Sequence, residues 1–514
     1  MNKIFKLLSL ASVSALLLTS CSGDQLDTVP SDSMLGTTLL GDATNALIPL
    51  NGIYRSMYTA GWSTTGNTHQ CFGISAYNLM AEVMGDDFIM GDMGSGWFWF
   101  DAVYNVKSHF TSTSWRSYDL WNAYYTWISN ANYILAAKNT MSGTPEEVNY
   151  VIGQAYAIRA YSYFMLSQSF ARTLVGHESD PCVPLYTEPT FTSTTGQPRS
   201  TNAQVYARID TDIDSAVTLL KGTTQQSTSH IGYGVALGLK SRIALVEEKW
   251  QEASEAAQAA ISASGKRILP VASFKGVNDV TAANVMWGAE VVTDQVGYYA
   301  SFFSHMDSLY HGNYAPKLIS HSLYESIPAT DARKAWWDPY SELSNGVAYE
   351  QKKFSFKNVG TWTGDYIWMR VEEMYLNAAE AEAHLGHDAA AQQLLQALMS
   401  QRDPSFDATK YTGNSLATLT SEHTGSLLDE IILQRRIELW GEAGRIYDIR
   451  RLHQGFRRVA SDGWPAADYP AVLLPNRPSD NPDSYMWVLT IPQAEFDGNA
   501  NMTLGNDQNP TSDQ

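Results

Sequence analysis

The chain has 514 residues, 44% of them hydrophobic, which is enough material for a large core. Its 34 basic and 53 acidic side chains give a formal net charge of −19 and a pI near 4.9. This charge argues against nucleic-acid binding, which requires clustered Lys and Arg, and against docking on anionic lipid headgroups.

The N-terminal segment has the three parts of a secretory signal. A positive end with two lysines precedes a mostly apolar stretch over residues 4–18, and small residues stand before Cys21. The run Leu18-Thr19-Ser20-Cys21 is the pattern that a lipoprotein signal peptidase reads. We therefore predict a lipoprotein signal peptide over residues 1–20, lipid attachment at Cys21, and a lipidated flexible tether over residues 21–35.

An ordinary signal peptide with a chance cysteine is the alternative, but the segment lacks an Ala-x-Ala site. The apolar run is also shorter than the roughly 20 residues that a spanning helix needs, and no longer run follows it. No long Pro, Ser or Gly linker divides the rest of the chain. We expect residues 36–514 to form a single domain on one side of the membrane.

Helical periodicity is the clearest local signal. In chain order, apolar residues recur three and four apart over residues 121–135, 236–246 and 367–385, and each segment is followed by another helix-like run. Small residues such as Gly234 and Gly238 fall where two helices would approach closely. We predict a mainly α fold of tetratricopeptide-like helical pairs, without a strict repeat period and with long aromatic-rich loop insertions.

Four long stretches lack periodicity and are rich in Gly, Ser, Thr, Asn and aromatic residues: 60–114, 172–200, 265–365 and 455–514. Loops of this length in a compact protein are usually functional or disordered. Their aromatic content argues against disorder, so we expect function to reside in them.

Several segments, spread in order along the chain, carry a family resemblance. They are Cys21 with Leu26-Asp27 and Pro30, Gly153-Gln154-Ala155 with residues 158–164, Pro198-Arg199-Ser200-Thr201, residues 370–381, residues 434–451, and Ile491-Pro492-Gln493-Ala494-Glu495. In their order and spread they resemble the SusD/RagB family of glycan-binding lipoproteins of the Bacteroidetes outer membrane. Gln154 and Gln434 stand where the family usually has Glu, and Glu372 stands where Ala is usual.

The resemblance implies a non-catalytic protein, lipid-anchored in the outer membrane and exposed on the cell surface. It implies a SusC-like TonB-dependent transporter as partner, over whose extracellular mouth the protein would sit as a lid. It also implies that an oligosaccharide lies against an aromatic arc built from an early loop and from insertions in the middle of the chain. Some members of the family bind peptides instead, and that alternative stays open.

Pyranose rings present flat C–H faces bordered by hydroxyls, so a site for them needs aromatic surfaces and a few hydrogen-bonding groups. In an extended segment, Trp97 and Trp99 would share one face. Because most Trp and Tyr side chains are buried, a place in the core is the alternative for each candidate. The candidate ligand-binding residues are Trp97, Trp99, Tyr298, Tyr299, Trp336, Trp337 and Trp362.

The charged run over residues 435–451 invites a catalytic interpretation, since carboxylates beside arginines are often tuned as acids and bases. We favour a structural interpretation, in which one helix carries the charges three and four apart, pairs them on its own surface and is tied to its neighbours. Catalytic motifs such as His-Glu-x-x-His, Gly-x-Ser-x-Gly and phosphate loops are absent from the sequence.

A surface-anchored glycoside hydrolase would need two carboxylates facing each other across a cleft, and Asp338 or Asp365 would suit that role. A third possible function is that of an assembly module, whose helical pairs bind protein partners. We predict that the chain is not an enzyme and has no catalytic residues.

We predict no cofactor and no metal. Asp86-Asp87 would suit a helix cap, a hydroxyl contact or a calcium ligand, of which we favour capping. Cys71 and Cys182 would form either a disulfide or two buried free thiols, and the sequence does not choose between them. Neither does it name the glycan.

Overall fold

The computed structural model describes residues 39–511, except residues 64, 106–110, 310–314, 342–345 and 476. The predicted signal peptide, Cys21 and the tether lie outside the described residues. Among those residues, no helix is both long and apolar enough to cross a membrane.

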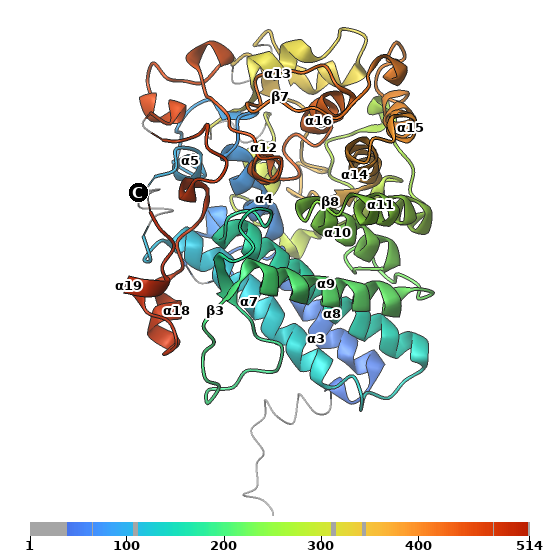
Figure 1. Cartoon of the computed structure of the whole chain (residues 1–514), viewed down its shortest axis with the longest axis vertical. Coiled ribbons are helices and arrows are strands. Elements are labelled where there is room, and N and C mark those ends of the chain that lie inside the picture. Colours follow the sequence, from blue (N-terminus) through green and yellow to red (C-terminus); the bar gives the residue numbers. More distant parts are fainter. Residues whose placement is uncertain are drawn as a thin grey trace, which may run out of the picture.

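Long helices packed against their sequence neighbours build one side of the molecule (Figure 1). They are α3 (Ala43–Ser56), α7 (Trp115–Ala136), α8 (Pro145–Phe170), α9 (Asn202–Leu220), α10 (Tyr233–Val246), α11 (Trp250–Ser264), α14 (Val371–His384) and α15 (Asp388–Met399). The prediction of a mainly α fold of tetratricopeptide-like pairs is confirmed, because α7 packs on α8, α10 on α11 and α14 on α15. Capping boxes at Thr144 and Thr201 begin α8 and α9.

The helix predicted from residue 367 begins only at Val371. Residues before it form strand β8 (Tyr366–Arg370), which pairs antiparallel with β4 (Val285–Ala289). Gly288 permits this pairing, since a Cβ there would lie 2.4 Å from the carbonyl oxygen of Tyr366. Apolar spacing alone does not separate a short buried strand from the first turn of a buried helix.

The loop insertions fold into short elements. A four-stranded sheet has the order β1 (Phe88–Met90), β5 (Lys317–Ile319), β7 (Glu350–Gln351) and β6 (Trp337–Asp338), and β2 (Pro181–Pro184) pairs with β3 (Arg199–Thr201). The shorter helices are α4 (Ile74–Val83), α5 (Trp99–Ala102), α12 (Phe302–Met306), α13 (His321–Ser326), α16 (Leu427–Glu438), α17 (Arg445–Arg451), α18 (Gln493–Gly498) and α19 (Leu504–Asp507).

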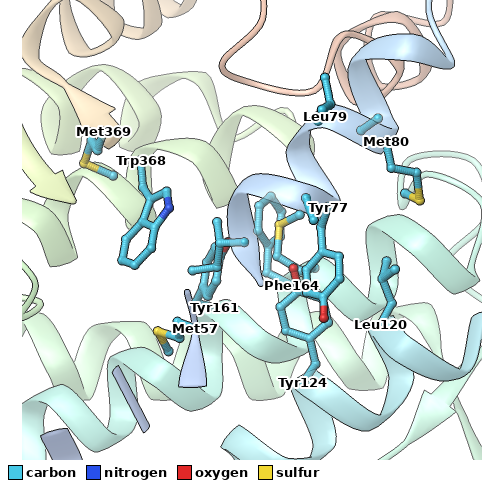
Figure 2. Packing of buried hydrophobic residues seen from close by; sticks show 14 of the residues in the cluster. Met57, Tyr77, Leu79, Met80, Leu120, Tyr124, Tyr161, Phe164, Trp368 and Met369 are labelled. Atoms are coloured by element: carbon cyan, nitrogen blue, oxygen red, sulfur yellow. The ribbon is translucent and has the colours of Figure 1, made fainter. Parts of the chain in front are cut away.

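Helix α4 lies at the centre of the core and is buried along its length except at Asn78. Figure 2 shows Tyr77 and Met80 of α4 among buried side chains of α7, α8 and β8, including Tyr124, Tyr161 and Trp368. A single apolar cluster therefore joins the helical pairs to the loop insertions, which fixes those loops in place.

The charged run over residues 435–451 forms two helices, and its side-chain pairs are buried between elements. The prediction of one helix with surface pairs is wrong, because Gly441 and Gly444 adopt left-handed backbone between α16 and α17. The prediction that the charges tie the helix to its neighbours is confirmed. The Glu438 carboxylate accepts hydrogen bonds from the guanidinium groups of three arginines, Arg333 at 3.3 Å, Arg370 at 3.2 Å and Arg402 at 2.8 Å.

Asp86 and Asp87 pair with arginines instead of capping a helix, so that prediction is wrong. Arg445 donates to Asp86 at 2.9 Å, and Arg436 donates to Asp87 at 2.6 Å. Burial opposes ionisation of Asp86, but the guanidinium groups of Arg445 and Arg436 lower its pKa to about 2. These ion pairs join the start of β1 to α16 and α17.

Cys71 and Cys182 are both free and buried. Burial raises the pKa of each thiol to about 12, so both thiols stay protonated at neutral pH. The sequence left open a disulfide or two buried free thiols, and the structure has the free thiols.

Candidate ligand-binding site

Four of the predicted aromatic residues gather at one place together with a histidine. We call the set His69, Trp97, Tyr298, Tyr299 and Trp362 the aromatic patch. Its members come from the 3-10 helix Thr68–Gln70, the turn before α5, the loop before α12 and the turn before β8. Tyr298 and Tyr299 are 41% and 50% exposed and the other three are half-buried, so the patch offers aromatic surface to solvent.

Ring contacts run from one end of the patch to the other. The His69 ring stacks on Trp97 with centroids 4.2 Å apart and an interplanar angle of 18°. Tyr299 packs edge-on against His69 at 6.1 Å and against Tyr298 at 4.3 Å. Tyr298 in turn packs edge-on against Trp362 at 4.5 Å. The rings therefore support one another and form a continuous surface.

His69 connects the two halves of the patch, and sequence reasoning missed it. Its Nδ1 lies 3.4 Å from the carbonyl oxygen of Tyr299, and its own carbonyl oxygen lies 2.6 Å from Nε2 of buried His305. The His305 ring also packs edge-on against Trp97 at 5.6 Å. A lone histidine in a polar loop carries no periodicity or motif, so only its position in space reveals this role.

A buried ion pair anchors the Trp97 side of the patch. The Arg116 guanidinium donates to Asp101 of α5 at 2.9 Å and to the carbonyl oxygen of Gln70 at 2.8 Å. The Gln70 side chain accepts a hydrogen bond from the backbone N–H of Phe98 at 2.6 Å. Because Gln70 follows His69 and Phe98 follows Trp97, these bonds fix the two stacked rings relative to each other.

Trp362 lies in a tight turn, next to the residue that closes it. The turn is closed by the antiparallel bridge between Asn358 and Thr363, and Trp362 adopts a left-handed backbone with φ of 56°. Such a conformation costs a non-glycine residue roughly 1–2 kcal/mol, and it persists where the surroundings enforce it. The Phe356 ring supports Trp362 edge-on at 5.3 Å, and Gly364 leaves room for Phe303, whose ring a Cβ would meet at 2.5 Å.

Trp99, Trp336 and Trp337 do not join the patch, because all three are buried. Their side chains are 5%, 5% and 1% exposed, so they present no face to a ligand. The expectation that Trp97 and Trp99 share a face of an extended segment is wrong, because Phe98 is left-handed and α5 begins at Trp99. Trp336 instead packs beneath the Lys353 ammonium, and Trp337 lies in β6 against Trp440.

The carboxylates considered for hydrolysis are engaged in structure. Asp365 is buried and accepts hydrogen bonds from the backbone N–H groups of Val280 and Val291, both at 3.1 Å, and from Lys357 at 2.9 Å. Asp338 is also buried, and it accepts from the backbone N–H of Tyr340 at 3.0 Å. Within the described residues, no group of three or more His, Cys, Asp or Glu side chains is arranged to hold a metal ion.

Two family models match the sequence. The model described as "Starch-binding associating with outer membrane" matches residues 74–245, and the SusD family model matches residues 319–511. Together they span more than half of the chain and include Trp97 in the first segment and Trp362 in the second. No curated protein matches the sequence.

Solved structures with the same fold cover nearly the whole described chain. A SusD-like carbohydrate binding protein from Bacteroides vulgatus is 23% identical, with a TM-score of 0.72 over 90% of this chain and 97% of that one. A SusD superfamily protein from Bacteroides thetaiotaomicron is 22% identical, with a TM-score of 0.73 over 91% and 100%. A laminarin binding SusD-like protein is 18% identical, with a TM-score of 0.62 over 91% and 99%. At these identities the similarity establishes the fold.

Proposed function

The chain belongs to the SusD/RagB family, and from that premise we propose that it is a cell-surface glycan-binding lipoprotein. In this proposal it captures an oligosaccharide on the aromatic patch and passes it to a TonB-dependent outer-membrane transporter. The protein binds the glycan without cleaving it.

The observation that carries this proposal is the convergence of aromatic rings from loops far apart in the sequence. Trp97 lies in the stretch over residues 60–114, and Tyr299 and Trp362 lie in different turns of the stretch over residues 265–365, yet ring contacts through His69 and Tyr298 join them. Apolar side chains that serve only the core would be covered, whereas Tyr298 and Tyr299 remain about half exposed. Exposed aromatic faces with hydroxyls at their edges match the C–H faces and hydroxyls of a pyranose.

The chemistry of the patch favours an uncharged ligand. Its members include no Asp, Glu, Lys or Arg side chain, and the protein as a whole carries a formal charge of −19. A negative surface repels polyanions over about one Debye length. We therefore propose a neutral glycan as the ligand class. The solved laminarin-binding relative of the same fold supports this class without naming the sugar for this chain.

Affinity gel electrophoresis tests the site. The triple variant Trp97→Ala, Tyr298→Ala, Tyr299→Ala should lose retardation in gels that contain the bound polysaccharide, chosen from laminarin, starch, xylan and mannan. The matched control is Tyr340→Ala with Leu504→Ala, which removes exposed apolar side chains outside the patch. Equal retardation of the triple variant and the wild type, with equal thermal stability, would refute the assignment.

Two further measurements separate the alternatives. Incubation with the bound glycan should release no reducing ends, and steady release would favour the hydrolase. In a parallel binding screen with casein peptides, we expect no peptide binding that depends on the patch, so the wild type and the triple variant should behave alike. Peptide binding that depends on the patch would make the protein a peptide-binding member of the family.

The location and the partner also belong to the proposal. Replacement of Cys21 by Ala should release the protein from the outer-membrane fraction, because the acyl chains would have no attachment site. Co-purification of the wild-type protein with a TonB-dependent transporter from detergent extracts is expected. In that complex the helical pairs would face the barrel, and the aromatic loops would face the ligand.

A further inference from the structure

The structure also has a hollow lined by aromatic residues, none of which belongs to the aromatic patch. Its cavity measures about 400 Å³ and is enclosed by α7, the loop that connects β2 to β3, and α18. Figure 1 shows these three segments beside one another, although they are far apart in the sequence. The volume falls within the range of small-molecule sites, which begins at about 300 Å³.

One face of α7 supplies the floor of the hollow. Trp121, Tyr125 and Ile128 line it at helical spacing, together with the ring of Tyr186 from the loop. In a helical pair such a face is normally covered by a neighbouring helix, but here a loop and a short helix cover it only in part. Trp121 and Ile128 are buried in this floor, so the aromatic surface that solvent reaches is that of the half-buried rings of Tyr125 and Tyr186.

An exposed ring stands at the rim. Phe191 is 64% exposed, and its position is held by a turn in which its backbone N–H donates to Thr194 Oγ1 at 2.8 Å. Tyr133 of α7 packs edge-on against Phe191 at 5.9 Å and donates from its hydroxyl to the carbonyl oxygen of Thr190 at 2.6 Å. The structure thus holds a phenyl ring at the edge of the hollow without covering it.

Unused polar groups line the same hollow. Across the described part of the chain, neither the Asn122 amide nor the Tyr118 hydroxyl has a hydrogen-bond partner. Asn132, deeper in the wall, is in contrast fully engaged, because it donates to the carbonyl oxygens of Tyr186 and Glu188 and accepts from Arg159. Asn122 and Tyr118 are therefore the groups available to a ligand, one as donor and acceptor and the other as a hydroxyl.

The hollow carries little charge. Glu495 is the one Asp, Glu, Lys, Arg or His side chain among its lining residues, and each of its carboxylate oxygens accepts a hydrogen bond. One accepts from Trp121 Nε1 at 3.1 Å and the other from the side chain of Asn499 at 2.7 Å. An anionic ligand would find no basic side chain here and would face the Glu495 carboxylate, whereas a neutral ligand with hydroxyls and an apolar face would match the walls.

We propose that this hollow is a second binding site, which takes a neutral saccharide unit. The sugar ring packs against Phe191 and the half-buried rings of Tyr125 and Tyr186, and its hydroxyls bond to Asn122 and Tyr118. The site would let one protein hold a glycan chain, or two chains, at separate points. Two linked contacts raise the overall affinity beyond that of either site alone.

The test uses the full-length protein with the patch removed by Trp97→Ala, Tyr298→Ala and Tyr299→Ala, so that the two sites are read separately. The probes are the methyl glycosides of glucose, galactose, mannose and xylose, observed by saturation-transfer NMR with titration. At least one probe should bind. Adding Phe191→Ala should weaken its Kd about tenfold, the cost of losing a buried phenyl contact. Asn122→Ala should also weaken it.

Tyr340→Ala in the same background is the matched control, because it removes another exposed ring from a loop, and it should leave the Kd unchanged. Absence of binding by all four glycosides would overturn the proposal, as would binding that Phe191→Ala and Asn122→Ala both leave intact. The proposed function has its own test. It is refuted if the polysaccharide retards the wild-type protein and the patch variant equally in the affinity gel.

Discussion

Replacement of Glu82 by Gln should make the protein more stable above neutral pH. Glu82 lies in α4 and is almost fully buried, and its carboxylate accepts hydrogen bonds from the backbone N–H groups of Ala443 at 3.1 Å and Gly444 at 2.7 Å. Burial raises its pKa from 4.5 to about 7, although the bond from Gly444 opposes that rise. The side chain is therefore held in a place that favours its neutral form.

The size of the effect follows from the pKa. Between pH 4.5 and 7 the folded protein holds the proton that the unfolded chain has released, so this group's stabilising contribution is present below pH 4.5 and is lost as the pH rises through 7. At about 1.4 kcal/mol per pH unit, the loss amounts to about 3 kcal/mol. Glutamine stays neutral, and its carbonyl oxygen still accepts from Ala443 and Gly444.

Urea denaturation of wild type and Glu82→Gln from pH 5 to pH 8 measures the effect as a difference in the free energy of unfolding. The variant should gain little near pH 5 and about 3 kcal/mol at pH 8. Glu325→Gln, at an exposed position in α13, is the control and should show a flat difference. A difference for Glu82→Gln that does not change with pH, or lower stability at pH 8, would refute the reasoning.

Further predictions concern other buried groups. Glu438→Gln should destabilise the fold by about 3–5 kcal/mol in urea, because three buried arginines lose their shared carboxylate; a change below about 0.5 kcal/mol would contradict this. Gln70→Ala should weaken glycan retardation although Gln70 lies beneath the patch, since Phe98 loses its anchor; unchanged mobility argues against positioning. In a Cys21→Ser protein, the thiols of Cys71 and Cys182 should react with Ellman's reagent only in denaturant, and rapid reaction in buffer would show accessible thiols.

The sequence predicted the helical pairs well because helical periodicity is a local property. The spacing of apolar residues over 121–135 and 236–246 identified α7 and α10. In a helix, residues three and four positions apart share one face, so the buried face is visible in the local sequence. The same reasoning misassigned residues 367–370. Their partner strand is β4, and pairing with a distant strand leaves no trace in the local spacing.

The candidate site shows the same division. Sequence reasoning placed function in the aromatic loops, and the patch does draw its rings from them, but it treated Trp97, Trp99 and Trp337 alike. Trp97 remains partly exposed while Trp99 and Trp337 are buried. Composition says that a loop is rich in aromatic rings, whereas the exposure of each ring depends on which remote segment packs against it.

By itself the sequence determined that this is a mainly α, acidic chain with tetratricopeptide-like pairs and aromatic loops, because periodicity, charge and residue type are read from neighbours. Only the tertiary structure decided that His69 joins Trp97 to Tyr299, and that Arg435 of α16 and the arginines of α17 are buried. Several of these contacts join distant segments, such as His69 with Tyr299, 230 positions apart, and Arg436 with Asp87, 349 positions apart. Hydrophobic burial and ion pairing select such contacts only when the whole chain is folded.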